Sequence, residues 1–221
     1  MRPDGIIFDL DGTLVDSLAE IAWAANRARA AIDLEALPAD AYRPWIGLGL
    51  RHLVASMLGD ELDHRIDDLV VGIRTVYETH SGERAAAYPG IEPLIASLRE
   101  LGVPLAVLTN KPHGPAQRLV AHRFDQGVFG SVIGQREGIE PKPDPAGAME
   151  IVEELGGVPE RWWFVGDMTI DIETARRAGM RSMGVTWGFA GGNDVAVELR
   201  AAGAEAIVDR PDEVLLTIGL A

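Results

Sequence analysis

The chain has 221 residues, and 20 basic against 34 acidic side chains give a formal net charge of -14 at pH 7. This length supports one substantial core, built either as one domain with a sizeable insertion or as two small domains. The negative charge disfavours nucleic acids and anionic membranes as partners. The lack of cysteine excludes disulfides, thiolate nucleophiles and cysteine-ligated zinc. Without a membrane-spanning run or a signal-peptide pattern, we expect a soluble, cytoplasmic protein.

The predicted elements follow two patterns along the chain. The first predicted strand is the apolar segment IIFDLD, and residues 16–81 after it are patterned as helices. From about residue 88 onward, short apolar segments rich in Val, Ile and aromatic residues alternate with helical segments. The strands of this second part are expected at 103–110, 129–134, 161–167, 180–187 and 204–208. Its helices are expected at 117–123, 145–155, 169–178 and 195–202, with a last short helix after the strand at 204–208.

This alternation predicts an α/β protein with a Rossmann-like parallel sheet. The helical stretch interrupts the pattern directly after the first strand. We therefore expect an α/β core formed by residues 1–15 and 82–221, and an inserted α-helical cap domain at residues 16–81. Loops at 12–18 and 80–90 would act as the hinges of that cap.

Polar side chains follow several of the predicted strands, and a proline-flanked loop, EPKPDP, carries a lysine. Ligands of open α/β sheets bind at the carboxyl ends of the strands, so these groups would lie together. Carboxylates, a hydroxyl, an amide and a lysine are typical of metal-assisted phosphoryl transfer. The residues concerned are Asp9, Asp11, Thr109, Asn110, Lys142, Asp167 and Asp171.

Four motifs carry a family resemblance over nearly the whole chain. They are, in order, FDLDGTLVDS (8–17), LTNKP (108–112), KPDP (142–145) and GDMTIDIETA (166–175). With these motifs the chain resembles phosphatases of the haloacid dehalogenase superfamily that carry a helical cap. Within the superfamily, TNKP and the segment IGLGLR (46–51) are most similar to phosphoglycolate phosphatases. The resemblance implies a magnesium-dependent phosphatase that acts on a small phosphorylated metabolite through an aspartyl-phosphate intermediate.

The resemblance assigns the chemical steps to the first motif. Asp9 would be the nucleophile, because a carboxylate that is ionised at neutral pH needs no activating base. Asp11 would protonate the departing alkoxide and later accept a proton from the attacking water. Strand geometry would turn both acids toward the substrate and Leu10 into the core. Gly12 would allow the backbone to approach the phosphate.

The other motifs would bind the phosphoryl group and a metal ion. Thr109 and Asn110 would donate hydrogen bonds to the phosphoryl oxygens, and Lys142 would neutralise their charge. Mg²⁺ would be held by Asp9, the backbone carbonyl of Asp11, Asp167 and Asp171. Four carboxylates against one lysine would repel a phosphate dianion, so the sequence predicts that activity requires the metal.

The helical insertion contains a segment that could select the substrate. Within YRPWIGLGLRHL, Gly47 and Gly49 would expose backbone amides, while Arg43 and Arg51 would bind a carboxylate such as that of phosphoglycolate. The alternative is that both arginines only solvate the helices, as arginines on helix surfaces commonly do.

Other functions remain open from the sequence. A sugar phosphomutase similar to β-phosphoglucomutase, a pyrophosphatase or a nucleotidase would share the same motifs. A dehalogenase is disfavoured because carbon–halogen cleavage needs no acid at Asp11, and a phospho-accepting receiver domain is disfavoured by the residue order and the long insertion. Each motif alone also has a structural explanation, such as a helix cap at Thr109 and Asn110. The sequence does not distinguish a monomer from a homodimer.

Overall fold

A computed structural model describes residues 2–189 and 194–220 of the chain. Six parallel strands form one sheet in the order β5-β4-β1-β6-β7-β8. This arrangement confirms the predicted α/β class. The strands are β1 (Gly5–Phe8), β4 (Leu105–Pro112), β5 (Ser131–Gln135), β6 (Trp162–Gly166), β7 (Arg181–Val185) and β8 (Ala206–Val208).

Helices cover both faces of this sheet and bury two apolar clusters. One cluster joins Trp163 to residues of α4, α5 and α9, and the other joins Trp162 to residues of α6 and α7. Successive strand residues face opposite sides, so the two tryptophans are core residues on different faces. The helices are α4 (Ile91–Glu100), α5 (His113–Arg123), α6 (Ala146–Leu155), α7 (Thr169–Arg177), α8 (Val195–Ala201) and α9 (Glu213–Thr217), with the short η3 (Pro159–Arg161) before β6.

Residues 18–80 form a helical insertion with an apolar cluster of its own. The chain enters it through β2 (Val15–Asp16) and leaves it through β3 (Ala86–Ala87), and these two short strands pair antiparallel. The insertion lies within the range predicted for the cap, 16–81. Its helices are α1 (Leu18–Ala30), η1 (Ala39–Trp45), α2 (Leu50–Leu58), η2 (Asp60–Arg65) and α3 (Ile66–His80).

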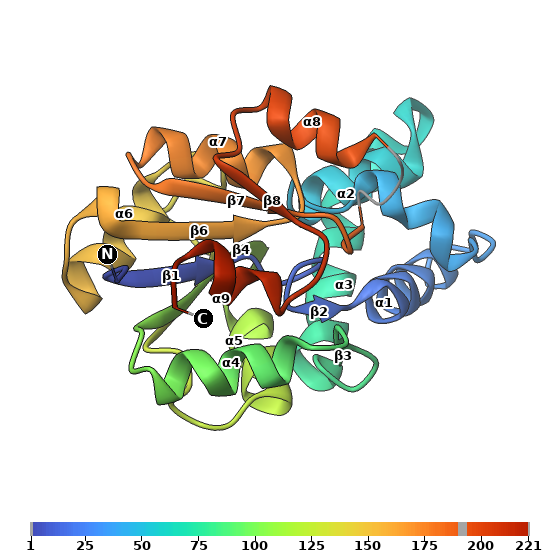
Figure 1. The fold of residues 1–221 in the computed structure, drawn as a ribbon. Helices are drawn as coiled ribbons and strands as arrows, with labels where there is room; N and C mark the ends of the chain where they lie inside the picture. The colour runs from blue at the N-terminus through green and yellow to red at the C-terminus, as the bar shows by residue number, and fades with distance from the viewer. Residues whose placement is uncertain (1, 190–193, 221) are drawn as a thin grey trace.

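The sheet topology places the ends of three strands at one edge, facing the insertion. β1 lies between β4 and β6, so the chain crosses from one side of β1 to the other at this point. Such a crossover leaves a crevice at the carboxyl ends of the strands, where α/β proteins bind ligands. Figure 1 shows the helical insertion beyond these strand ends. Among the described residues, none of the helices has the length and apolar character of a membrane span.

Candidate active site

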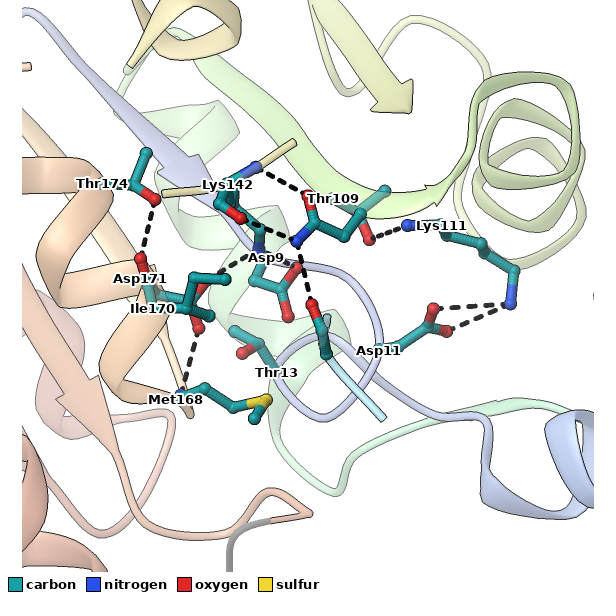
Figure 2. Close-up of polar contacts among 12 residues, drawn as sticks. Asp9, Asp11, Thr13, Thr109, Lys111, Lys142, Met168, Ile170, Asp171 and Thr174 are labelled. Carbon is teal, nitrogen blue, oxygen red and sulfur yellow. Dashed lines mark hydrogen bonds and ion pairs between the residues drawn. The ribbon is translucent and has the colours of Figure 1, made fainter. Parts of the chain in front are cut away.

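Asp9 lies at the carboxyl end of β1 and is held by a lysine from another part of the chain. The Nζ of Lys142 lies 2.6 Å from Oδ1 of Asp9 and 2.6 Å from Oδ1 of Asp171. All three side chains are buried, and Figure 2 shows Lys142 between the two carboxylates. Asp171 also accepts the backbone N–H of Met168 at 3.0 Å, which fixes its carboxylate at the N-terminus of α7.

Asp167 follows β6 and completes a cluster of three buried acids. Its Oδ1 accepts the hydroxyl of Thr13 at 3.1 Å, and its Oδ2 accepts the backbone N–H of Phe189 at 2.8 Å. Burial, with a further contribution from the charge of Asp171, raises the pKa of Asp167 to about 7. A Cβ atom at Gly12 would lie 2.5 Å from Oδ2 of Asp167, so the glycine allows the backbone beside Asp11 to approach this carboxylate closely.

The three acids fit a divalent cation. Asp9, Asp167 and Asp171 each offer an oxygen, and these oxygens lie within 4.8 Å of one another. Burial raises the pKa of Asp9 well above its ordinary value. The positive charge of Lys142 lowers this pKa, and the negative charges of Asp171 and Asp167 raise it further. One lysine therefore does not compensate three buried carboxylates. Oxygen-rich sites with excess negative charge are the kind that hard cations such as Mg²⁺ occupy.

Asp11 and Thr109 lie beside this cluster but have other partners. Asp11 accepts the hydroxyl of Ser17 at 2.5 Å, and its carboxylate faces the ammonium of Lys111 (Figure 2). Oγ1 of Thr109 accepts the backbone N–H of Lys111 at 3.2 Å, which leaves the hydroxyl hydrogen of the threonine able to donate to a ligand. Leu10 is fully buried in the core, as predicted from the strand geometry.

Asn110 joins the sheet to the insertion instead of presenting its amide to a ligand. Its Nδ2 donates to the carbonyl oxygen of Gly47 at 2.9 Å and to that of Lys142 at 3.2 Å. Its Oδ1 accepts the backbone N–H of Lys142 at 2.8 Å. An amide NH₂ has two hydrogens, and both are used within the protein. The side-chain amide therefore orients the Lys142 loop, and the expected hydrogen bond from Asn110 to a phosphoryl oxygen stays a prediction for its backbone N–H.

The sheet edge and the insertion enclose a cavity of about 50 Å³. Its polar floor carries the predicted residues Asp9, Asp11, Thr109, Asn110, Lys142 and Asp171, and the backbone at Gly47 and Gly49 contributes to its rim. The wall from the insertion is mainly apolar and consists of Ile21, Trp45, Ile46, Leu50, Leu53 and Tyr77.

Arg43 and Arg51 of the insertion do not line this cavity. Arg51 pairs with Asp67, and its side chain is 67% exposed. Arg43 pairs with Asp40 at 2.9 Å. The expectation that these guanidiniums bind a substrate carboxylate is therefore not met by this arrangement, in which Arg43 lies over the ring of Phe189 and Arg51 is exposed.

Sequence reasoning gave no role to a second lysine of the cavity. Lys111 belongs to the LTNKP motif and lies at the end of β4, where it is buried near Asp11, Glu20 and Tyr77. Burial disfavours its charged form, but the charges of Asp11, Tyr77 and Glu20 outweigh that effect and raise the pKa of Lys111. Burial likewise raises the pKa of Tyr77 to about 12. The signal in the sequence was the position of this lysine, directly after Thr109 and Asn110.

Comparisons with known proteins place this site in a family. The sequence model of the haloacid dehalogenase-like hydrolases matches residues 6–185. A phosphoglycolate phosphatase of Pseudomonas putida is 33% identical over 207 residues, which are 89% of this chain and 74% of that protein. One from Psychrobacter arcticus is 30% identical over 198 residues, 86% of each chain.

Solved structures resemble the chain over almost its full length. A candidate phosphoglycolate phosphatase from Lactobacillus delbrueckii superposes with a TM-score of 0.89 at 29% identity and covers 99% of both chains. CbbY from Rhodobacter sphaeroides, in complex with phosphate, superposes with a TM-score of 0.80 at 27% identity and covers 96% of both. Sequence, fold and the buried acids at the sheet edge lead to one assignment: the chain belongs to the haloacid dehalogenase-like hydrolases.

Proposed function

We propose that this protein is a magnesium-dependent phosphatase that hydrolyses a small phosphomonoester, 2-phosphoglycolate, through an aspartyl phosphate at Asp9. The observation that carries the proposal is the contact of Asp9 with Lys142, 2.6 Å apart, beside two further buried carboxylates at the floor of a cavity between sheet and insertion. The names of the relatives from Pseudomonas and Psychrobacter support the choice of substrate.

In the first step, a carboxylate oxygen of Asp9 attacks phosphorus. A bond forms between that oxygen and phosphorus, and the bond from phosphorus to the ester oxygen breaks. Asp11 donates its proton to the leaving alkoxide, and the alcohol departs. Lys142 holds the nucleophile in place and balances the negative charge of the phosphoryl oxygens, while the hydroxyl of Thr109 donates to one of them.

In the second step, water attacks the phosphorus of the aspartyl phosphate. Asp11, now ionised, accepts a proton from the water, and the bond from Asp9 to phosphorus breaks. Inorganic phosphate leaves and Asp9 returns as a carboxylate. Asp9, Asp167 and Asp171 would hold Mg²⁺, and when bound the ion supplies positive charge that offsets the charge of the transferring group.

The size of the cavity supports a small substrate. One water needs roughly 10–15 Å³ of such volume, so a cavity of about 50 Å³ has room for roughly four waters. A two-carbon phosphate ester occupies a similar space. A nucleotide or a hexose phosphate is larger, so part of it would have to extend beyond this cavity.

A hydrolysis screen tests the reaction and the substrate together. The full chain is assayed with magnesium on 2-phosphoglycolate, 2-hydroxyethyl phosphate, pyrophosphate, a nucleoside monophosphate and a hexose phosphate. We expect the highest kcat/KM for 2-phosphoglycolate and no activity in excess EDTA, restored by added magnesium. Full turnover in EDTA contradicts the metal requirement. Dependence on a sugar bisphosphate as activator would instead indicate a phosphomutase.

The covalent step has a separate test. Enzyme quenched in acid during turnover of ³²P-labelled substrate should carry the label on the peptide that contains Asp9. The Asp9→Asn protein should carry none, and its kcat should fall by roughly 10⁴-fold or more, because loss of a nucleophile removes the whole covalent route. Label on another residue during rapid turnover would overturn the mechanism.

A further inference from the structure

The chain has only two lysines, Lys111 and Lys142, and its other 18 basic residues are arginines. Both lysines line the same cavity, and the exposed fractions of their side chains are 2% and 3%. Burying an ammonium group is costly unless acceptors satisfy it. The acceptors around the two lysines therefore indicate what each one does.

Lys142 has two acceptors at short distance within the protein, whereas Lys111 has none that is as close. The Nζ of Lys142 has two carboxylate oxygens at 2.6 Å. The Nζ of Lys111 lies 3.4 Å from both oxygens of Asp11 and 3.9 Å from Oε1 of Glu20. Charge-assisted N–H···O contacts are typically about 2.7–2.9 Å long. Within the described part of the chain, Lys111 thus has no acceptor at a normal distance for its three hydrogens.

The acids near Lys111 each have a closer donor of their own. Asp11 accepts the hydroxyl of Ser17 at 2.5 Å, and Oε2 of Glu20 accepts the backbone N–H of Gly82 at 2.6 Å. Oε1 of Glu20 is buried and has no hydrogen-bond partner among the described residues. Neither acid is drawn up to the ammonium, so the arrangement leaves Lys111 able to direct a hydrogen into the cavity.

The reaction geometry indicates which part of a substrate meets this lysine. Asp11 protonates the ester oxygen in the proposed function, so that oxygen must lie against the carboxylate of Asp11. Lys111 is 3.4 Å from the same carboxylate. Groups two or three bonds beyond the ester oxygen are then within its reach. The carboxylate of 2-phosphoglycolate is separated from the ester oxygen by one methylene.

We propose that Lys111 is the specificity-determining residue of this site and binds the carboxylate of the substrate. The role expected of Arg43 and Arg51 thus falls to the buried lysine at the end of β4. This inference rests on the proposed function, because the position of the ester oxygen comes from the proposed chemistry. Glu20 and Tyr77 place the lysine: the ring centroid of Tyr77 lies 4.5 Å from its Nζ.

A substrate pair tests the assignment. We compare kcat/KM for 2-phosphoglycolate with kcat/KM for 2-hydroxyethyl phosphate, in which an uncharged CH₂OH replaces the carboxylate. In Lys111→Met the ratio between these two values should fall by about 10- to 100-fold, as loss of a charge-assisted hydrogen bond implies. Lys111→Arg keeps the charge and should retain more of the ratio. Lys142→Met is the matched control, since it should slow both substrates together and leave the ratio near that of the wild type.

An unchanged ratio in Lys111→Met overturns the inference: an equal loss for both substrates would place the lysine in the chemistry alone, and no loss for either would leave it without a role in the site. A wild-type enzyme that hydrolyses 2-hydroxyethyl phosphate as well as 2-phosphoglycolate also overturns it, while leaving the phosphatase activity intact. If no phosphomonoester is hydrolysed, the proposed function is refuted instead. A binding measurement then decides whether Lys111 binds the carboxylate of the ligand.

That measurement uses the fact that two lysines give two side-chain NMR signals. In Asp9→Asn protein labelled with ¹³Cε-lysine, the signals are assigned with Lys111→Arg. We expect 2-phosphoglycolate to shift the Lys111 signal and 2-hydroxyethyl phosphate to leave it in place. No shift with 2-phosphoglycolate, or equal shifts with both compounds, overturns the inference. The readout needs neither turnover nor a stable Lys111→Met protein.

Discussion

The two sides of the cavity are built in different ways. On the sheet side, Asp9, Lys142 and Asp171 are buried and joined by 2.6 Å contacts. On the insertion side the wall is mainly apolar, and Lys111, the lysine of the sheet edge that faces Glu20 of the insertion, has contacts of 3.4 Å and longer. Strand ends fix the backbone and so fix the charged groups that perform chemistry, whereas helices packed over them supply shape and exclude water. This difference between the two sides predicts that substitutions among the charged residues of the sheet side lower the free energy of unfolding as well as the activity.

The largest effect is expected for Lys142→Met. Removing this ammonium leaves Asp9 and Asp171 buried without their counterion, and breaking a buried ion pair costs about 3–5 kcal/mol. Lys111→Met should cost only about 1–2 kcal/mol, because its longer contacts carry less energy. Urea denaturation at pH 7.5 in EDTA measures both free energies of unfolding. Equal losses for the two lysines would refute the contrast between the short contacts of Lys142 and the longer contacts of Lys111.

The next effect tests how the two sides are joined. Asn110→Ala removes the donor to the carbonyl of Gly47 and leaves the backbone N–H of Lys142 without its acceptor. We expect a loss of about 2–3 kcal/mol in the free energy of unfolding, since buried groups lose their partners. We also expect kcat to fall about 10-fold or more as the Lys142 loop loses its orientation.

Asn110→Asp is the matched control, because its neutral carboxyl group keeps an acceptor for the backbone N–H of Lys142 and has one donor in place of two. It should retain more stability than Asn110→Ala at a pH where the new carboxyl group is neutral. If both variants keep the kcat of the wild type, the amide does not orient the lysine.

The sheet side was largely predictable from the sequence. Apolar segments that end in Asp9, Thr109 and Asp167 could be assigned to strands by pattern, and parallel strands bring such ends to one edge. Helix α4 was not predicted, although Ile91, Leu94 and Leu98 follow a helical period. The order of strands and the partners of Asn110 were also beyond prediction, because they depend on contacts between residues far apart in the chain.

The insertion side was less predictable for a physical reason. Arg43 and Arg51 flank glycines that do reach the cavity, but the direction of a side chain on a helix depends on how the helix packs, which no local motif specifies. The apolar residues that the insertion contributes to the cavity wall have the same helical spacing as ordinary core residues, so the sequence does not distinguish them. Lys111 was overlooked because its neighbours Glu20 and Tyr77 come from distant helices.

A smaller effect is expected where the insertion touches the sheet. Gly47 has a φ of 104°, and a Cβ there would lie 2.2 Å from the sulfur of Met168. Gly47→Ala should therefore cost about 1–2 kcal/mol through backbone strain and displacement of the methionine. In the double variant Gly47→Ala/Met168→Ala, the clash with the methionine should be absent. The loss of free energy of unfolding in the double variant should therefore be smaller than the sum of the two single losses by about 0.5 kcal/mol or more. Strict additivity in urea denaturation would show that Met168 moves away without cost.

The smallest effects are expected at the arginines of the insertion. Arg51→Ala removes an exposed ion pair with Asp67, and Arg43→Ala removes one with Asp40. Pairs of this kind contribute about 0–1 kcal/mol, so the free energy of unfolding should change little. KM for 2-phosphoglycolate should stay within about 2-fold of the wild-type value, because neither guanidinium lines the cavity. A rise in KM of about 10-fold in either variant would mean that the arginine turns toward the cavity when substrate binds. Lys111 would then not be the only residue that binds the carboxylate of the substrate.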